Sequence, residues 1–105
     1  MRLKRNYKPY ILPEAKNDMR FAALWYNKQA KGLGKKFIKR IKEKVQSIQP
    51  NPFVCQLRHK DVRTAIVEQF PYVIHYIVND SDKIIFIIAV LHTKQSPLVM
   101  NKRIE

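Results

Sequence analysis

The chain has 105 residues, which is enough for one domain with a hydrophobic core and too few for a second domain. Hydrophobic residues make up 46% of it and charged residues 28%, and this composition excludes an intrinsically disordered chain. The formal net charge of +13 is concentrated in residues 1–48, which hold 14 Lys and Arg against 3 Asp and Glu. It favours an anionic partner, whether RNA, DNA or an acidic protein.

Two features of the sequence set the expected compartment. The longest apolar run, residues 84–91, is far shorter than the roughly 20 residues of a membrane span, and the first residues lead into no hydrophobic signal segment. Cys55 is the only cysteine, so the chain has no internal disulfide and no cysteine pair for a zinc site. We therefore expect a cytoplasmic protein with no membrane association, no metal and no cofactor.

The first half of the chain predicts one strand and two helices. Residues 7–12 form a short strand that Pro13 closes, because proline suits the first turn of a helix. Apolar residues at three- and four-residue spacing predict a helix over 13–30 and a second helix over 33–48, which Pro50 terminates. About two residues separate the helices, so they should form an antiparallel hairpin.

The second half predicts strands. After a loop that contains Cys55, Arg58 and His59, β-branched and aromatic residues are enriched over 62–70, 72–78 and 84–91, with a hairpin turn between the last two. The predicted order is β-α-α-β-β-β over residues 1–105. The sequence therefore predicts a single α+β domain with a mostly antiparallel sheet and the helical hairpin packed on one face.

The last predicted strand is apolar on both faces. Strict alternation places one set of side chains on one face and the other set opposite: Ile84, Phe86, Ile88 and Val90 against Ile85, Ile87, Ala89 and Leu91. Two helices can cover only one face. The other must be covered by the tail residues 98–100, by strand curvature or by another chain, and the sequence leaves these alternatives open.

Four segments together resemble the RelE/ParE superfamily of bacterial toxins, and the ParE-like members more closely. They are Trp25-Tyr26, residues 32–37 at the start of the second helix, residues 70–76, and residues 89–92 at the end of the last strand. The resemblance spans residues 7–97. It implies the small α+β fold and a cognate acidic antitoxin whose C-terminal segment wraps the toxin, with a homodimer or a heterotetramer with the antitoxin as candidate assemblies.

The superfamily divides into ribosome-dependent mRNA endonucleases and ParE-like poisons of DNA gyrase. For an endonuclease, the resemblance implies Arg63 and Lys94 on phosphate and His92 for proton transfer. The alternative interpretations are an exposed arginine at a strand end and a buried, hydrogen-bonded histidine. His75 and Tyr76 point to opposite faces of their strand, and we expect both to pack in the core.

The tail favours the ParE-like members. Ribonuclease members typically supply an aromatic residue or a His-Tyr pair near the C-terminus, and none follows His92 here. The tail is similar to a ParE-like ending, but Gln95 and Ser96 stand where that pattern has an arginine and an acid. We therefore predict a non-enzymatic gyrase inhibitor that an antitoxin neutralises. The alternatives are a ribosome-dependent mRNA endonuclease and a non-toxic basic module that binds nucleic acid.

Two sets of residues are predicted to contact partners. The cationic face of the second helix and one tail residue form the target or nucleic-acid set: Lys35, Lys36, Lys39, Arg40 and Gln95. Apolar side chains form the antitoxin set: Trp25, Ile85, Ile87 and Leu91. The alternative for the cationic set is a solvated helix face.

Overall fold

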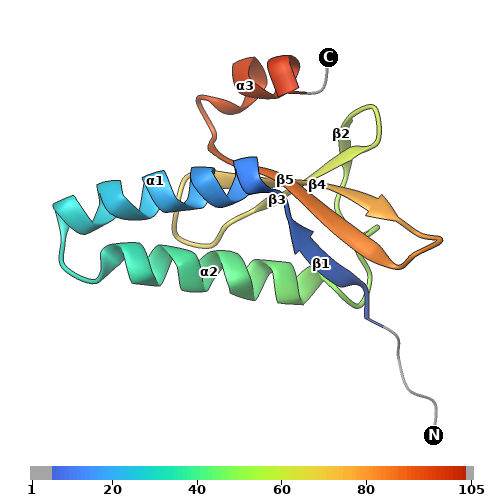
Figure 1. Ribbon diagram of the computed structural model, residues 1–105, viewed down its shortest axis with the longest axis horizontal. Coiled ribbons are helices and arrows are strands. Elements are labelled where there is room, and N and C mark those ends of the chain that lie inside the picture. The colour runs from blue at the N-terminus through green and yellow to red at the C-terminus, as the bar shows by residue number, and fades with distance from the viewer. Residues whose placement is uncertain (1–5, 104–105) are drawn as a thin grey trace, which may run out of the picture.

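The computed structural model describes residues 6–103, and these contain three helices and five strands (Figure 1). In chain order they are β1 (Lys8–Ile11), α1 (Pro13–Gln29), α2 (Leu33–Ile48), β2 (Leu57–His59), β3 (Val62–Ile66), β4 (Tyr72–Asn79), β5 (Ile84–His92) and α3 (Ser96–Arg103). The predicted α+β class is confirmed. Within these residues no helix is both long enough and apolar enough to cross a membrane.

The five strands form one sheet in the order β1-β5-β4-β3-β2. β1 pairs with β5 in parallel and every other pair is antiparallel, so the predicted mostly antiparallel sheet is confirmed. β5 lies between β1 and β4, so it has a hydrogen-bonded neighbour on each side. This interior position explains why its sequence is apolar throughout.

α1 and α2 form the predicted antiparallel hairpin against one face of the sheet (Figure 1). Gly32 makes the turn between them in the left-handed conformation, with φ of 81°, which glycine adopts without strain. Gly34 lets the helices approach closely, because a Cβ atom there would lie 2.3 Å from the carbonyl oxygen of Ala23. The buried side chains of the hairpin and the sheet form the main core, with Met19, Phe37, Ile41, Ile74, Ile85 and Ile87 among them.

Two elements, β2 and α3, were not predicted, and β3 is shorter than predicted. β2 has three exposed residues and no apolar alternation, so its sequence carries no strand signal. The strand predicted over 62–70 ends at Ile66, because the chain turns at Gln69, where φ is 69°, and the Val67 N–H donates to the carbonyl of Tyr72. The tail forms a helix, α3, with Pro97 in its first turn, where a missing N–H has no cost.

The strict alternation predicted for β5 is wrong from Ala89 onward. His75 pairs with Ala89 and the next residue, Tyr76, pairs with Ile87, so Ile88 is the extra residue of a β-bulge. The bulge returns Val90 to the main core beneath the hairpin. It turns Ala89 and Leu91 to the opposite face.

α3 covers part of that opposite face. Ala89 and Leu91 form a second small core there with Val62 of β3 and Met100 of α3, and all four are buried. The sequence left three possible covers for this face of β5, and the structure shows that the C-terminal tail is one of them. α3 therefore becomes one wall of any site on this side of the sheet.

Candidate functional site

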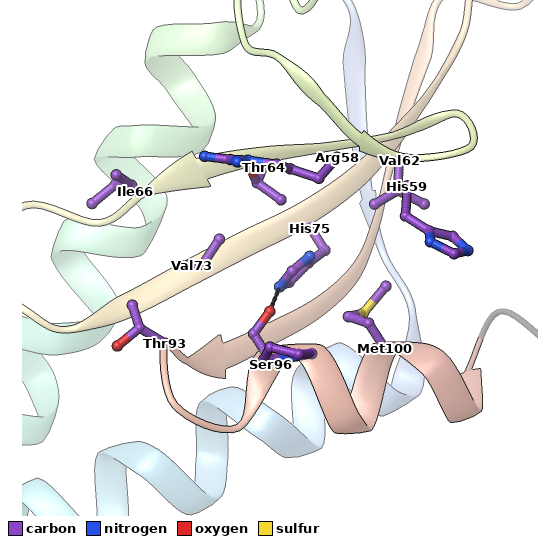
Figure 2. Close-up of a pocket in the computed structure, with 11 residues that line it drawn as sticks. Arg58, His59, Val62, Thr64, Ile66, Val73, His75, Thr93, Ser96 and Met100 are labelled. Atoms are coloured by element: carbon purple, nitrogen blue, oxygen red, sulfur yellow. Dashed lines mark hydrogen bonds between the residues drawn. The ribbon is translucent and has the colours of Figure 1, made fainter.

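A groove with a cavity volume of about 480 Å³ lies on the sheet face opposite the hairpin, between β3, β4 and α3 (Figure 2). Much of its lining is apolar, and Val62, Ile66, Val73 and Met100 contribute to it. Arg58 is the only Lys or Arg among the described residues that line it, and no carboxylate lines it. The groove therefore offers an apolar surface with one cation at its edge.

His75 of β4 and Ser96 of α3 meet in this groove (Figure 2). The Ser96 hydroxyl lies 2.8 Å from the His75 Nε2 atom, and the histidine is only 5% exposed. Burial, aided by the positive charge of Arg103 and opposed by Asp18, lowers the pKa of His75 to about 4. A neutral imidazole with so low a pKa is a weak base, and no carboxylate within residues 6–103 hydrogen-bonds to it. The pair thus tethers α3 to the sheet, and His75 and Tyr76 are both buried as expected.

A second tether joins α3 to α1 across the bulge of β5. Arg103 donates from Nη1 and Nη2 to the two carboxylate oxygens of Asp18, both at 2.8 Å. Asp18 also accepts from the Val90 N–H at 3.0 Å, and Arg103 donates to the Ile88 carbonyl at 3.3 Å. The ion pair therefore satisfies a donor and an acceptor that the bulge removes from the strand ladder.

Arg63 lies outside the groove. It pairs with Tyr76, so it is on the hairpin side of the sheet. Its Nη1 donates to the carbonyls of Cys55 at 2.6 Å and Phe53 at 3.3 Å, and its guanidinium stacks on the Phe53 ring. These contacts hold the loop before β2, so the guanidinium is already occupied.

His92 and Lys94 lie at the other end of the sheet from Arg63. His92 pairs with Tyr72 and Arg63 pairs with Tyr76. Because these partners are four residues apart on β4, His92 and Arg63 are separated by about 13 Å along the strand direction alone. His92 packs its ring edge-on against Tyr72, and its Nδ1 accepts from the Lys94 N–H at 3.1 Å. The structure does not bring the three predicted catalytic residues into one site.

His92, Gln95 and Trp25 do come together, although a different role was predicted for each of them. With Tyr26 and Tyr72 they line a shallow pocket of about 400 Å³ on the hairpin side. Trp25 also belongs to a run of exposed apolar side chains at helical spacing on α1, which we term the α1 apolar stripe: Phe21, Leu24 and Trp25, which are 69%, 54% and 55% exposed.

The other three residues of the predicted antitoxin set are buried. Ile85 and Ile87 lie beneath the hairpin with no exposed surface, and Leu91 lies beneath α3. A partner could contact them only after the hairpin or α3 moved. Of that set, only Trp25 offers an accessible surface.

The cationic face of α2 divides into two parts. Arg40 is held by Glu43 at 2.8 Å and by Gln69 at 3.1 Å. Lys35, Lys39 and Lys42 are exposed, share one side of the helix at i, i+4 and i+7, and have no salt-bridge partner among the described residues. We term these three residues the lysine stripe, and Lys36 is exposed beside them.

Binding of a metal ion requires several side chains that coordinate it together. No group of three His, Cys, Asp or Glu side chains within residues 6–103 is placed to hold a metal ion.

Comparison with solved structures shows that the chain shares its fold with chains of known toxin-antitoxin systems. The chromosomal ParDE toxin-antitoxin system from P. aeruginosa contains a chain that matches with a TM-score of 0.71 and 20% identity, over 82% of this chain and 95% of that one. A double mutant of the E. coli toxin RelE in the free state matches with a TM-score of 0.71 and 21% identity, over 95% and 99%. The RelBE2 toxin-antitoxin complex from Mycobacterium tuberculosis contains a chain with a TM-score of 0.61 and 16% identity, over 83% and 98%.

The family follows from the sequence. The model of the ParE toxin family of type II toxin-antitoxin systems, parDE, matches residues 10–97. The chain therefore belongs to the ParE toxin family. A search of curated protein sequences finds no significant match.

Proposed function

We propose that this protein inhibits DNA gyrase in the cytoplasm and is neutralised by a cognate acidic antitoxin, and that it is not itself an enzyme. The proposal starts from membership of the ParE toxin family. The observation that carries it further is the composition of the groove on the open face of the sheet. Among the described residues only one Lys or Arg lines this groove, whereas cleavage of RNA needs several cationic groups around the phosphate.

Cleavage of RNA by attack of a 2′-hydroxyl needs cations on the phosphorane, a base and an acid. The described groove lining contains one arginine, Arg58, and two histidines, His59 and His75, and burial lowers the pKa of His75 to about 4. Arg63 is engaged by backbone carbonyls and lies far along the sheet from His92. These features argue against the endonuclease alternative and support inhibition by binding.

The antitoxin contact that we propose is the α1 apolar stripe. Three adjacent exposed apolar side chains are unusual on a helix that is otherwise amphipathic, and such patches commonly mark protein interfaces. Tryptophan is enriched among residues that dominate binding energy. Trp25 is thus the proposed anchor.

The test is a gyrase supercoiling reaction with the purified protein. We expect inhibition or trapped DNA cleavage, and we expect supercoiling to return when the cognate antitoxin is added. Trp25→Ala should weaken this rescue at least about tenfold, as expected for loss of an interface anchor. Tyr10→Ala on β1 is the matched control, because Tyr10 is also an aromatic residue with 55% exposure.

Two results would contradict the proposal. One is supercoiling that proceeds unchanged at a molar excess of the protein. The other is the appearance of new mRNA 5′ ends after induction in cells, detected by primer extension, that disappear in the Arg63→Ala variant. The second result would establish the endonuclease alternative.

A further inference from the structure

The lysine stripe carries positive charge that the folded chain does not neutralise. On α2, the one ion pair among the described residues joins Arg40 to Glu43. Lys35, Lys39 and Lys42 lie three or four residues apart, and like charges at this spacing destabilise a helix by a few tenths of a kcal/mol per pair. The free protein therefore tolerates a repulsion that an anionic partner would relieve.

The chemistry of the stripe fits phosphates better than a protein. A stable protein interface needs buried apolar or aromatic anchors. The exposed large apolar side chains of the described hairpin all lie on α1, as Phe21, Leu24 and Trp25, and none lies on α2. The two helices thus present surfaces of different kinds, an apolar one on α1 and a cationic one on α2.

The geometry of the stripe fits a duplex. From Lys35 to Lys42 the helix rises about 10 Å, which spans roughly three phosphates of one DNA strand at its rise of 3.4 Å. Proteins that bind single strands add aromatic side chains on which bases stack. The lysine stripe contains none.

We propose that Lys35, Lys39 and Lys42 form a phosphate-binding surface for duplex DNA. The choice of DNA over RNA rests on the proposed function, because gyrase holds duplex DNA while it acts. The surface would place the toxin on the DNA segment beside the enzyme that it inhibits. Binding at this surface would be independent of sequence, since phosphate contacts carry no base information.

The test is fluorescence anisotropy of a short labelled DNA duplex of random sequence, titrated with the full chain between about 50 and 200 mM salt. Neutralising each phosphate contributes about 0.9 to the slope of log K against log salt, so K35Q/K39Q/K42Q should lower that slope by roughly 2–3. Its affinity at the lower salt should fall at least about tenfold. The matched control is K8Q/K16Q/K102Q, which removes the same charge from exposed lysines outside the stripe and should retain most of the affinity.

Thermal unfolding of the variants distinguishes a loss of DNA binding from a loss of folding. Removal of the repulsion on α2 should leave the melting temperature of the K35Q/K39Q/K42Q variant equal to or above that of the wild type. Equal losses of affinity in the two triple variants would overturn the proposal, because net charge alone would then explain binding. It would also be overturned by absence of DNA binding, by tighter binding to duplex RNA or a single strand, or by binding of the stripe to polyglutamate but not to DNA.

The gyrase reaction is measured separately, so the two proposals fail separately. A protein that binds duplex DNA through the lysine stripe but leaves supercoiling unchanged contradicts the proposed function and supports the surface. Conversely, if the wild type and K35Q/K39Q/K42Q inhibit gyrase equally while neither binds DNA, that result would support the proposed function and contradict the DNA-binding surface.

Discussion

A single buried histidine couples the stability of this protein to pH. His75 has a pKa of about 4 in the folded protein and 6.5 as an ordinary imidazole, because burial and Arg103 both disfavour the charged ring. The unfolded chain therefore binds a proton more readily than the folded one. Stability is unaffected above about pH 6.5 and is lost as the pH falls from there toward 4, by at most about 3 kcal/mol.

His75→Gln tests this coupling. Glutamine retains a partner for the Ser96 hydroxyl but does not titrate, so the variant should lose less stability than the wild type between about pH 6.5 and 4. The measurement is urea unfolding across that range, taking the difference between the two proteins because carboxylates titrate in both. His59→Gln, at an exposed position in β2, serves as the control and should follow the wild type. Parallel curves for wild type and His75→Gln would disprove the coupling.

At the scale of elements, the packing of α1 on α2 depends on Gly34. Helix propensity alone predicts that alanine would stabilise α2 by up to about 1 kcal/mol. A methyl group at this position would instead lie 2.3 Å from the Ala23 carbonyl oxygen and 2.7 Å from the Asn27 side-chain oxygen. The backbone of α1 cannot move aside without opening the hairpin core, so the steric effect should dominate.

We therefore expect Gly34→Ala to lower the free energy of unfolding by about 1–3 kcal/mol, the usual cost of overpacking. Equilibrium denaturation with urea measures it as a lower midpoint at unchanged slope. Lys36→Ala, an exposed substitution two residues further along α2, should change stability by less than about 0.5 kcal/mol. A Gly34→Ala variant as stable as the wild type would show that the helices separate more easily than their packing indicates.

Elements that depend on local interactions could be predicted from the sequence, whereas features that depend on long-range contacts could not. The hairpin followed from local spacing, since residues such as Phe37 and Ile41 repeat with the helix period. The bulge at Ile88 depends on pairing with β4 and on Asp18, which lies far away in the sequence, so no local pattern marks it. β2 is too short and too exposed to have a period.

The candidate site was less predictable than the fold for the same reason. The groove exists because α3 packs back on the sheet, and that packing depends on contacts of His75 with Ser96 and of Asp18 with Arg103. Residue types at strand ends indicated Arg63 and His92, but strand register separates them. The lysine stripe and Trp25 were visible in the sequence, because their exposure follows from helical periodicity alone.

At the scale of the whole molecule, the ion pair of Asp18 and Arg103 joins residues 85 positions apart and connects α1, β5 and α3. Their side chains are 12% and 19% exposed, so loss of one partner leaves a poorly solvated charge. The main core contains no described side chain of α3. Breaking the pair should therefore release α3 and the bulge without unfolding the hairpin and the sheet.

Asp18→Asn tests this connection by hydrogen exchange. The amides of α3 and Val90 should lose protection by about tenfold or more, while those of β4 and α2 remain near their wild-type values. Glu14→Gln is the control, because Glu14 approaches Arg103 only to 3.8 Å and its side chain is 67% exposed, where an ion pair contributes little. Equal loss of protection throughout Asp18→Asn would mean that α3 unfolds only with the whole domain, and unchanged protection in α3 would mean that Met100 and Ser96 hold it without the ion pair.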